Sequence, residues 1–313
     1  MEDKAGFTLS LDCEGLWGMA DQPSVVQAGE INDRSLADTY EFIRCTLDAA
    51  GVRSTAAFVS AFAVEADALI QELPLLEQLA GYAPAWFAHV LPALQSRQLN
   101  GWRGAGFYKA FQRDGHEMAW HGATHMALSD DTPQAAIELE IQLAQRLLPQ
   151  LGALPRSIVF PRNKVGHLEP LARAGFETYR ASPPAGLLGR VSGLANEWRF
   201  MDGRVSAKPA AANGWHISPA GFFLNWPSGA RSWVPLNVTV KRWESLLRAA
   251  ASTGGYVHIW FHPHNLITAP AMKTSFAKIM NTVGELIRSG DMCSLTMAEA
   301  NGHFAKGTQG KFA

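Results

Sequence analysis

Two acidic residues follow an apolar strand pattern near the start of the sequence. In "FTLSLDCEG", residues 7–15, apolar and polar residues alternate as in a half-buried β-strand, and Asp12 and Glu14 come at its end. The alternation places both carboxylates on one side of the extended chain, where they repel each other. If they are buried, each needs a positive partner or a proton. The pair therefore indicates a site that attracts positive charge.

Histidines with metal-ligand spacing follow a second strand pattern. "GHEMAWHGATH", residues 115–125, contains His121 and His125, which on a helical turn would share one face and could bind one metal ion. The same spacing also occurs by chance, but the carboxyl ends of strands are where ligands gather in parallel α/β folds. Two imidazoles and one carboxylate from two strand ends predict a catalytic zinc site with one coordination position left open.

A third group of histidines ends a late strand. "VHIWFHPHN", residues 257–265, contains His258 in the middle of the strand, where a structural role is expected, and His262 at its end, before Pro263. His262 has the properties of a general acid, with packing in a tryptophan-rich core as the alternative. His264 is compatible with either role.

An arginine also lies at an expected strand end. Arg162, in "IVFPRN", residues 158–163, could hold a catalytic carboxylate ionised through two hydrogen bonds. The alternative is an arginine at the surface that contacts only solvent.

The elements that position these residues alternate between short strands and amphipathic helices. Strands are expected at 6–12, 54–60, 116–122, 156–161, 256–262 and 292–297, and helices at 35–51, about 132–148, 168–175 and 272–290. Repeated β-then-α units predict an α/β fold with a mostly parallel sheet, open or closed into a barrel. A helical insertion at about 62–112 and an irregular one at about 181–235 interrupt this order, so one domain over 1–313 with two insertions is expected.

Composition narrows the class of protein. The 313 residues carry a formal net charge of -1, which argues against a nucleic-acid-binding protein. Three scattered cysteines suit a reducing compartment, and we see neither a secretory signal nor a run of 18 apolar residues. The sequence predicts a cytoplasmic protein, with peripheral association with the inner membrane as an alternative. It does not predict the oligomeric state.

The order of the four motifs resembles a known family. Asp12-x-Glu14, His121-x-x-x-His125, "FPRN" and "FHPH" together resemble the NodB-homology polysaccharide deacetylases, carbohydrate esterase family 4. The similarity is greatest to the branch associated with bacterial surface-carbohydrate biosynthesis, such as lipopolysaccharide. The resemblance implies a distorted (β/α) barrel with the site at the carboxyl ends of its strands.

The resemblance also implies a role for individual residues. Asp12 matches the general base, His262 the general acid, and Arg162 the arginine that tethers the base. The implied metal ligands are Glu14, His121 and His125, with Zn²⁺ as the first expectation and cobalt, nickel or manganese as alternatives. Because the motif is Asp-x-Glu rather than two adjacent aspartates, the roles of Asp12 and Glu14 could be exchanged. Substrate contacts are expected for Trp17, Asn163 and His264, and the fourth family motif has as candidates Glu197, Trp198 and Asp202.

The implied reaction is hydrolysis of an N-acyl group, acetyl or formyl, on an amino sugar of a bacterial surface polysaccharide or its precursor. The saccharide could be nucleotide-linked, lipid-linked or polymeric. Two alternatives remain: an allantoinase-like amidohydrolase acting on a non-sugar amide, and a non-catalytic carbohydrate-binding relative. Most tryptophans of the second insertion are expected to bury an irregular lid, and at most one or two to contact sugar: Trp198, Trp215, Trp226 and Trp233.

Overall fold

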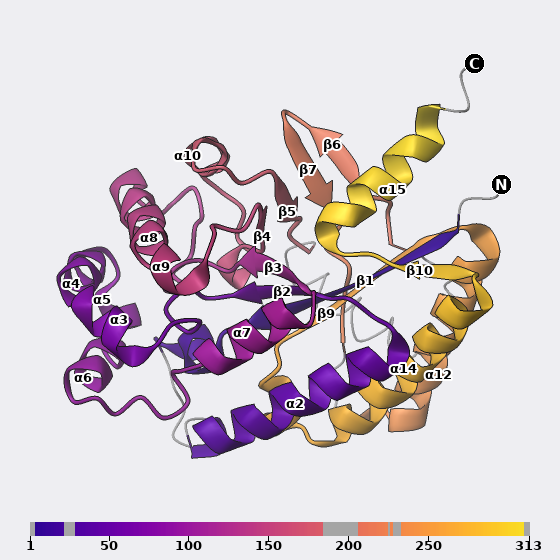
Figure 1. Cartoon of the computed structure of the whole chain (residues 1–313), viewed down its shortest axis with the longest axis horizontal. Helices are drawn as coiled ribbons and strands as arrows, with labels where there is room; N and C mark the ends of the chain where they lie inside the picture. Colours follow the sequence, from indigo (N-terminus) through magenta and orange to yellow (C-terminus); the bar gives the residue numbers. More distant parts are fainter. Residues whose placement is uncertain (1–3, 22–28, 184–205, 225, 228–232, 310–313) are drawn as a thin grey trace.

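One curled, mostly parallel sheet runs through the molecule (Figure 1). A computed structural model describes residues 4–21, 29–183, 206–224, 226–227 and 233–309, with side chains described as far as 304. The strand order is β6-β7-β5-β4-β3-β2-β1-β9-β8, and β10 also pairs with β1. Its strands are β1 (Ala5–Cys13), β2 (Thr55–Phe58), β3 (Glu117–Trp120), β4 (Ser157–Ile158), β5 (Thr178–Arg180), β6 (Ala210–Ala212), β7 (Trp215–Ser218), β8 (Phe222–Phe223), β9 (Tyr256–Phe261) and β10 (Met292–Ser294).

Helices surround this sheet. They are α2 (Asp33–Ala50), α3 (Ala66–Gln71), α4 (Leu73–Tyr82), α5 (Pro84–Phe87), α6 (Val90–Gln95), α7 (Ala105–Arg113), α8 (Gln134–Arg146), α9 (Leu148–Leu151), α10 (Leu168–Arg173), α12 (Leu236–Thr253), α13 (Asn265–Thr268), α14 (Ala271–Ser289) and α15 (Met297–Gln309), with 3-10 turns η1 (Gly15–Met19) and η2 (Pro161–Asn163). Figure 1 shows α2, α14 and α12 packed side by side along the strands. The architecture confirms the predicted α/β fold, a distorted barrel formed by a single domain.

The central strand β1 is buried over its whole length. It was expected to be half-buried, but both faces are covered. Its apolar residues pack in the main core, whereas its polar side chains form hydrogen bonds, such as that from the Thr8 hydroxyl to the Leu295 carbonyl at 2.9 Å. Parallel pairing with β2 and β9 brings the carboxyl ends of the three strands together.

Local signals fix the long helix α2. Asn32 and Ser35 exchange side-chain-to-backbone hydrogen bonds of 3.0 Å, a capping box that starts the helix two residues earlier than predicted. Gly51, in the left-handed conformation with φ 66°, ends it where the sequence predicts. The apolar face between these caps is buried. It packs against α14, and the Tyr40 ring lies 6.2 Å from the ring of Phe58 in β2.

The two insertions differ in how well the sequence predicted them. The first is helical as expected and contains α3 to α7. The described part of the second contains an antiparallel hairpin of β6 and β7, which the sequence analysis missed. Asn213 and Gly214 join its strands with φ values of 51° and 80°, so the Asn-Gly pair was a readable turn signal.

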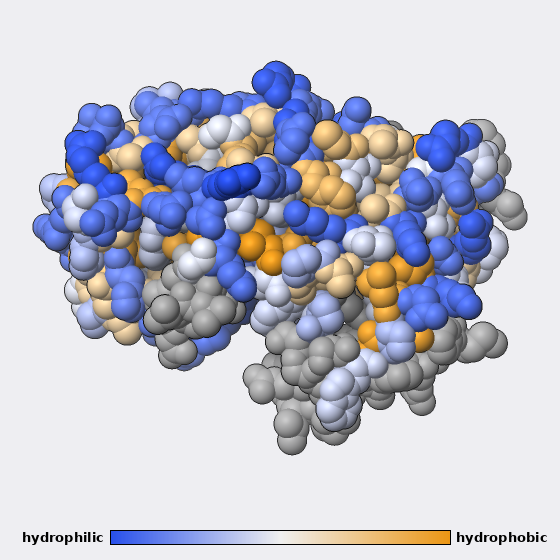
Figure 2. Space-filling model, turned by 90° about the horizontal axis from the view of Figure 1, so that it is seen from below, coloured by the Kyte–Doolittle hydropathy of each residue, from blue (hydrophilic) through white to orange (hydrophobic). Residues whose placement is uncertain are grey.

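The surface is predominantly polar on the face shown in Figure 2, where hydrophobic residues occur in separate groups. Tyr82 and Trp233 are the large apolar side chains that are exposed among the described residues, at 47% and 80%. Within the same residues, no helix combines the length and the apolar character needed to cross a membrane.

Candidate active site

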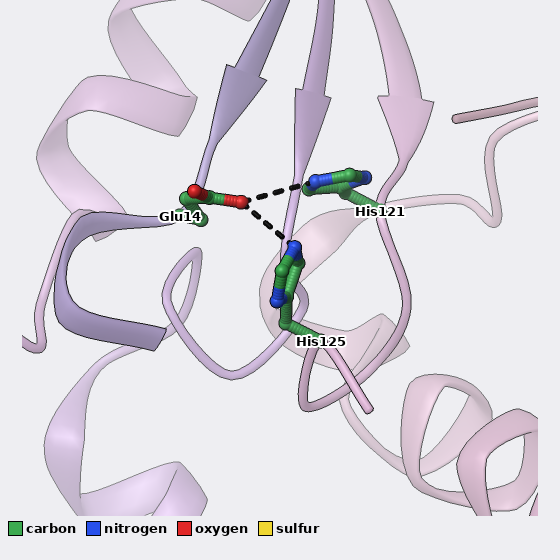
Figure 3. Close-up of side chains that lie close together, drawn as sticks. All are labelled: Glu14, His121 and His125. Atoms are coloured by element: carbon green, nitrogen blue, oxygen red, sulfur yellow. Dashed lines mark hydrogen bonds and ion pairs between the residues drawn. The ribbon is translucent and has the colours of Figure 1, made fainter. Parts of the chain in front are cut away.

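Three predicted metal ligands converge at the carboxyl ends of β1 and β3 (Figure 3). One carboxylate oxygen of Glu14, Oε2, lies 3.1 Å from His121 Nε2 and 2.8 Å from His125 Nε2. All three side chains are at least 95% buried. The structure therefore brings together the three residues that the sequence selected, although Glu14 and His121 are 107 positions apart in the chain.

The hydrogen bonds around His121 test whether this group fits a cation. Its Nδ1 lies 2.8 Å from the Val159 carbonyl, which can only accept, so Nδ1 carries the proton. Nε2 then directs its lone pair at the Glu14 carboxylate, an arrangement that needs a metal ion or a second proton between the two atoms. A carbonyl on the distal nitrogen is the usual support of a metal-bound histidine. The donor set of one carboxylate and two imidazoles fits a divalent metal.

The two histidines do not share a helical turn, contrary to prediction. Residues 121–128 form a loop, in which Gly122 and His125 have φ values of 77° and 63°. A side chain at position 122 would approach Pro161 to 2.9 Å, so glycine is required there. The strained turn, rather than helical spacing, directs both rings toward Glu14.

A buried carboxylate on α8 holds this loop. Glu140 Oε2 accepts hydrogen bonds from the backbone N–H groups of Ala123 at 2.7 Å and Thr124 at 3.2 Å, and Oε1 accepts from the Thr124 hydroxyl. Burial raises the pKa of Glu140 to about 7, although these three bonds act in the opposite direction. The sequence analysis missed this residue, although its position on the apolar face of the helix, between Ile137 and Leu143, was a readable signal of burial.

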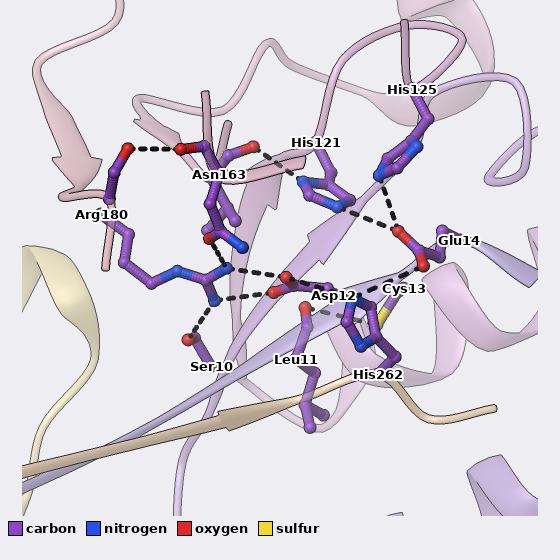
Figure 4. A network of polar contacts seen from close by, with 12 residues as sticks. Ser10, Leu11, Asp12, Cys13, Glu14, His121, His125, Asn163, Arg180 and His262 are labelled. Carbon is purple, nitrogen blue, oxygen red and sulfur yellow. Dashed lines mark hydrogen bonds and ion pairs between the residues drawn. The ribbon is translucent and has the colours of Figure 1, made fainter. Parts of the chain in front are cut away.

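The second carboxylate, Asp12, is held by an arginine other than the one predicted (Figure 4). Arg180, at the end of β5, donates to both Asp12 oxygens at 2.7 Å, and its side chain is only 1% exposed. The Trp260 ring lies under its guanidinium group at 4.4 Å. The tether assigned to Arg162 thus belongs to Arg180. The sequence analysis did not predict this strand, which has only three residues.

Backbone conformation explains why Arg162 does not reach Asp12. Arg162 and Asn163 have φ values of 57° and 53°, which turns the Arg162 side chain outward, where it pairs with Asp21 at 2.6 Å. Asn163 instead points inward, and its Oδ1 accepts a hydrogen bond of 2.9 Å from Arg180. The predicted contact between Asn163 and substrate is thus replaced, at that oxygen, by a contact that orients Arg180.

A hydrogen-bonded chain with a defined direction lies behind Arg180. His258 Nδ1 is 3.0 Å from the Pro219 carbonyl and must donate to it, so the neutral ring accepts at Nε2 from the Ser10 hydroxyl at 2.8 Å. Ser10 Oγ in turn accepts from Arg180 at 3.0 Å. Burial, reinforced by the Arg180 charge, lowers the pKa of His258 to about 3, which keeps the ring neutral. The structural role expected for His258 is therefore observed.

His262 faces both carboxylates from the end of β9. Its Nε2 lies 3.6 Å from Glu14 Oε1 and 3.9 Å from Asp12 Oδ2, and its side chain is 25% exposed, more than that of either carboxylate. The Asn265 side-chain oxygen accepts from the His262 backbone N–H, so it also accepts from Nδ1, both at 3.2 Å. Nε2 is thus directed at the carboxylates and at the open side of the site.

The remaining predicted contacts have different outcomes. Trp17 is 1% exposed and donates its indole N–H to the Trp102 carbonyl at 3.1 Å, so it cannot contact substrate as predicted. His264 is buried and stacked on His262, and burial lowers its pKa to about 4. The fourth-motif candidates Glu197, Trp198 and Asp202 lie outside the described residues.

The second-insertion tryptophans also differ from one another. Trp215 is buried and Trp226 is half-buried, with its indole N–H donating to the Thr268 hydroxyl at 3.2 Å, as expected of residues that pack an irregular segment. Trp233 is exposed and does not bury the segment.

Charges within the site favour ionised carboxylates despite deep burial. Burial raises the pKa of Asp12, but the charges of Arg180, His121 and His262 outweigh it and leave the pKa below its usual value. Burial also opposes ionisation of Glu14, yet His125, His262 and His121 hold its pKa well below the usual range. The site therefore presents two negative charges to whatever binds at its centre.

Comparison with known proteins identifies the fold. No family model and no curated protein matches the sequence. Similar solved structures include a protein from Mycobacterium smegmatis described as a polysaccharide deacetylase, with a TM-score of 0.56, 15% identity, and coverage of 98% of this chain and 92% of that one. Another is described as a polysaccharide deacetylase from Pseudomonas aeruginosa PAO1, with a TM-score of 0.56, 10% identity, and coverage of 96% and 91%. Puue allantoinase has a TM-score of 0.55, 11% identity, and coverage of 96% and 89%. This chain therefore has the fold of these proteins.

Proposed function

We propose that this protein is a metal-dependent hydrolase that removes an N-acyl group, acetyl or formyl, from an amino sugar. The observation that carries the proposal is the convergence of three groups with different tasks. They are the Glu14–His121–His125 cluster, the Asp12–Arg180 pair, and His262 within 3.9 Å of both carboxylates.

Glu14, His121 and His125 would hold the divalent ion, Zn²⁺ by first choice, which supplies Lewis acidity for water and the acyl oxygen. Asp12, kept ionised by Arg180, accepts the proton of the attacking water. The water oxygen bonds to the acyl carbon. The C–N bond breaks as His262, in the imidazolium form with a proton on both ring nitrogens, donates its Nε2 proton to the departing amine and keeps the Nδ1 proton bonded to Asn265. This assignment gives Asp12 the base and Glu14 the ligand role, because Glu14 is the carboxylate in contact with both histidines.

The proposed substrate is an amino sugar of a bacterial surface polysaccharide, such as lipopolysaccharide, or of its precursor. The resemblance of the four motifs supports this choice, as does the fold shared with two proteins described as polysaccharide deacetylases. A cytoplasmic location is part of the proposal. The ureide alternative is supported by the fold shared with Puue allantoinase.

The experiment combines metal analysis with substrate profiling. Purified protein is assayed by mass spectrometry for bound metal, then incubated with N-acetyl and N-formyl amino sugars and with allantoin while released acid and amine are measured. We expect about one divalent ion per chain and release of acid from an amino sugar, which stops in Asp12→Asn. Turnover of allantoin alone would favour the ureide hydrolase over the amino-sugar hydrolase. A protein that binds no metal would refute both hydrolase hypotheses.

A further inference from the structure

A pocket of about 270 Å³ lies beside the proposed catalytic centre and takes no part in the chemistry described above. It is formed where the end of α4 and the helix α5 meet the loop that follows His125. Residues that line it include two aromatic and two charged side chains, Tyr82, Trp86, Asp131 and Arg162.

The pocket shares a wall with the metal-ligand cluster. Trp86 donates its indole N–H to the Thr124 carbonyl at 2.8 Å, and its ring centroid is 5.6 Å from that of His125. The Arg162 guanidinium lies over the same indole, 4.5 Å from its centre. A group bound in the pocket is thus separated from a proposed metal ligand by a single aromatic side chain.

The side chains of the pocket indicate the class of ligand. Tyr82 is one of two large apolar side chains that are exposed among the described residues, and an exposed aromatic ring offers a flat surface for an apolar face of a ligand. Asp131 and Arg162 offer hydrogen-bond acceptors and donors at the rim. Aromatic faces combined with planar polar groups suit a sugar ring, which presents C–H groups on its faces and hydroxyls on its edge.

Charge argues against an anionic ligand. The Arg162 charge is paired with Asp21 at 2.6 Å, and Asp131 adds a further carboxylate to the pocket wall. A phosphate or a nucleotide diphosphate would therefore meet no surplus of positive charge here. A neutral saccharide meets no such penalty.

We infer that this pocket is a subsite for a second, uncharged sugar residue, linked to the amino sugar whose acyl group reaches the metal-ligand cluster. The inference rests on the proposed function and narrows it, because it makes the substrate an oligosaccharide or polymer rather than a nucleotide-linked monosaccharide. Tyr82 stacks on the second sugar, and Asp131 and Arg162 bind its hydroxyls.

The test measures binding separately from turnover. Calorimetric titrations of the zinc-loaded full chain use the N-acetylglucosamine and N-acetylgalactosamine monosaccharides, their β-linked disaccharides, and UDP-N-acetylglucosamine. An aromatic contact of about 1.4 kcal/mol corresponds to a tenfold change in Kd, so we expect at least one disaccharide to bind about ten times more tightly than its monosaccharide. Tyr82→Ser removes the tighter binding of the disaccharide without changing the Kd of the monosaccharide. Asp131→Asn reduces the difference between the two Kd values. Trp233→Ser, the matched exposed aromatic outside the pocket, preserves it.

The outcomes separate this inference from the proposed function. Equal binding of monosaccharides and disaccharides overturns the subsite, as does an advantage that survives Tyr82→Ser or tighter binding of the nucleotide sugar. Deacetylation of a monosaccharide in the same samples would leave the proposed function standing in those cases. Conversely, a disaccharide advantage that depends on Tyr82, with no acyl release by the wild type, would support the subsite and refute the hydrolase. Thermal melting confirms that Tyr82→Ser, a surface change, remains folded.

Discussion

Arg180 binds both carboxylate oxygens of Asp12 at 2.7 Å across 168 residues of sequence, and both side chains are almost completely buried. The planar guanidinium matches the carboxylate with two parallel bonds, which fixes the orientation of Asp12 as well as its charge. The contact is therefore the structural basis for assigning Asp12, rather than Glu14, to proton transfer.

The first prediction concerns this pair. Arg180→Lys keeps a positive charge but loses the two-point contact, and we expect kcat to fall by about 100-fold because the base is no longer oriented. Arg180→Gln also removes the charge that lowers the pKa of Asp12, so that pKa rises. The acidic limb of the pH–rate profile reports protonation of the base and moves to higher pH.

Arg162→Gln is the matched control for this prediction, because Arg162 is the arginine that the motif resemblance selected. Measured on a monosaccharide, its pH–rate profile keeps the wild-type acidic limb. If Arg162→Gln moved that limb and Arg180→Gln did not, the assignment of the tether to Arg180 would be wrong. Folding of each variant is checked by thermal melting, because removal of one partner from a buried ion pair costs about 3–5 kcal/mol.

The second prediction separates the two carboxylates. Glu14→Gln and His121→Ala are expected to purify with less than about a tenth of an equivalent of metal, since each removes one of three ligands. Asp12→Asn retains about one equivalent but loses acyl release, because Asp12 contacts Arg180 rather than the two histidines. Metal content by mass spectrometry provides the measurement. Loss of metal in Asp12→Asn with retention in Glu14→Gln would show that the roles are exchanged.

The sequence predicted the residues at strand ends better than the contacts between them. Asp12, Glu14, His121 and His262 follow strongly apolar strands whose carboxyl ends must meet in a parallel sheet, so their proximity could be predicted. Arg180 ends a three-residue strand, too short for a clear periodic signal. Neither could the sequence show that position 162 adopts φ 57°.

The spacing of His121 and His125 had two structural solutions. A helical turn and a loop with a left-handed residue both bring positions four apart to one side, and the sequence favoured the first. Gly122 was the residue that distinguished them, because its φ of 77° is strained for any other residue. The apolar face of α8 indicates that Glu140 is buried, but which loop it binds depends on the tertiary packing of that helix.

The third prediction tests how Glu140 holds the metal-ligand loop. Glu140→Ala removes the acceptor for two backbone N–H groups and one hydroxyl, and we expect about 10- to 100-fold weaker zinc binding, the usual effect of losing a ligand support. Glu140→Gln retains an acceptor oxygen and restores most of the affinity. Chelator competition measures the Kd. Glu138→Ala, on the exposed side of the same helix, is the control and keeps wild-type affinity. Equal affinities in all variants would contradict the role given to Glu140.

The fourth prediction concerns stability in acid. His258 has a pKa near 3 in the folded protein against 6.5 in the unfolded chain, so only the unfolded chain binds its proton between these values. The contribution of His258 to the free energy of unfolding is complete above pH 6.5. It is lost as pH falls toward 3, at about 1.4 kcal/mol for each pH unit. Urea unfolding at pH 6.5 and pH 5 therefore shows a decrease of about 2 kcal/mol from this residue.

Two substitutions make that measurement specific. Glutamine at position 258 cannot titrate. His258→Gln therefore reduces the change in unfolding free energy between pH 6.5 and pH 5 by the amount assigned to His258, whatever its effect on stability at pH 7. His216→Gln, at an exposed position on β7, is the control for the replacement of a histidine by glutamine. An identical slope in wild type and His258→Gln would mean that His258 is not held neutral by its surroundings.

The fifth prediction tests His262 as the proton donor to the leaving amine. An amine departs poorly without a proton, whereas p-nitrophenolate leaves readily without one, so the need for a general acid depends on the leaving group. His262→Gln is expected to lower kcat for an N-acetyl amino sugar by about 10²- to 10⁴-fold, and kcat for p-nitrophenyl acetate by less than tenfold. Metal content, measured in parallel, stays near one equivalent, because the three ligands are intact. Equal losses on both substrates, or loss of the metal, would show that His262 acts as a ligand or a structural residue, since neither role discriminates between an amine and a phenolate.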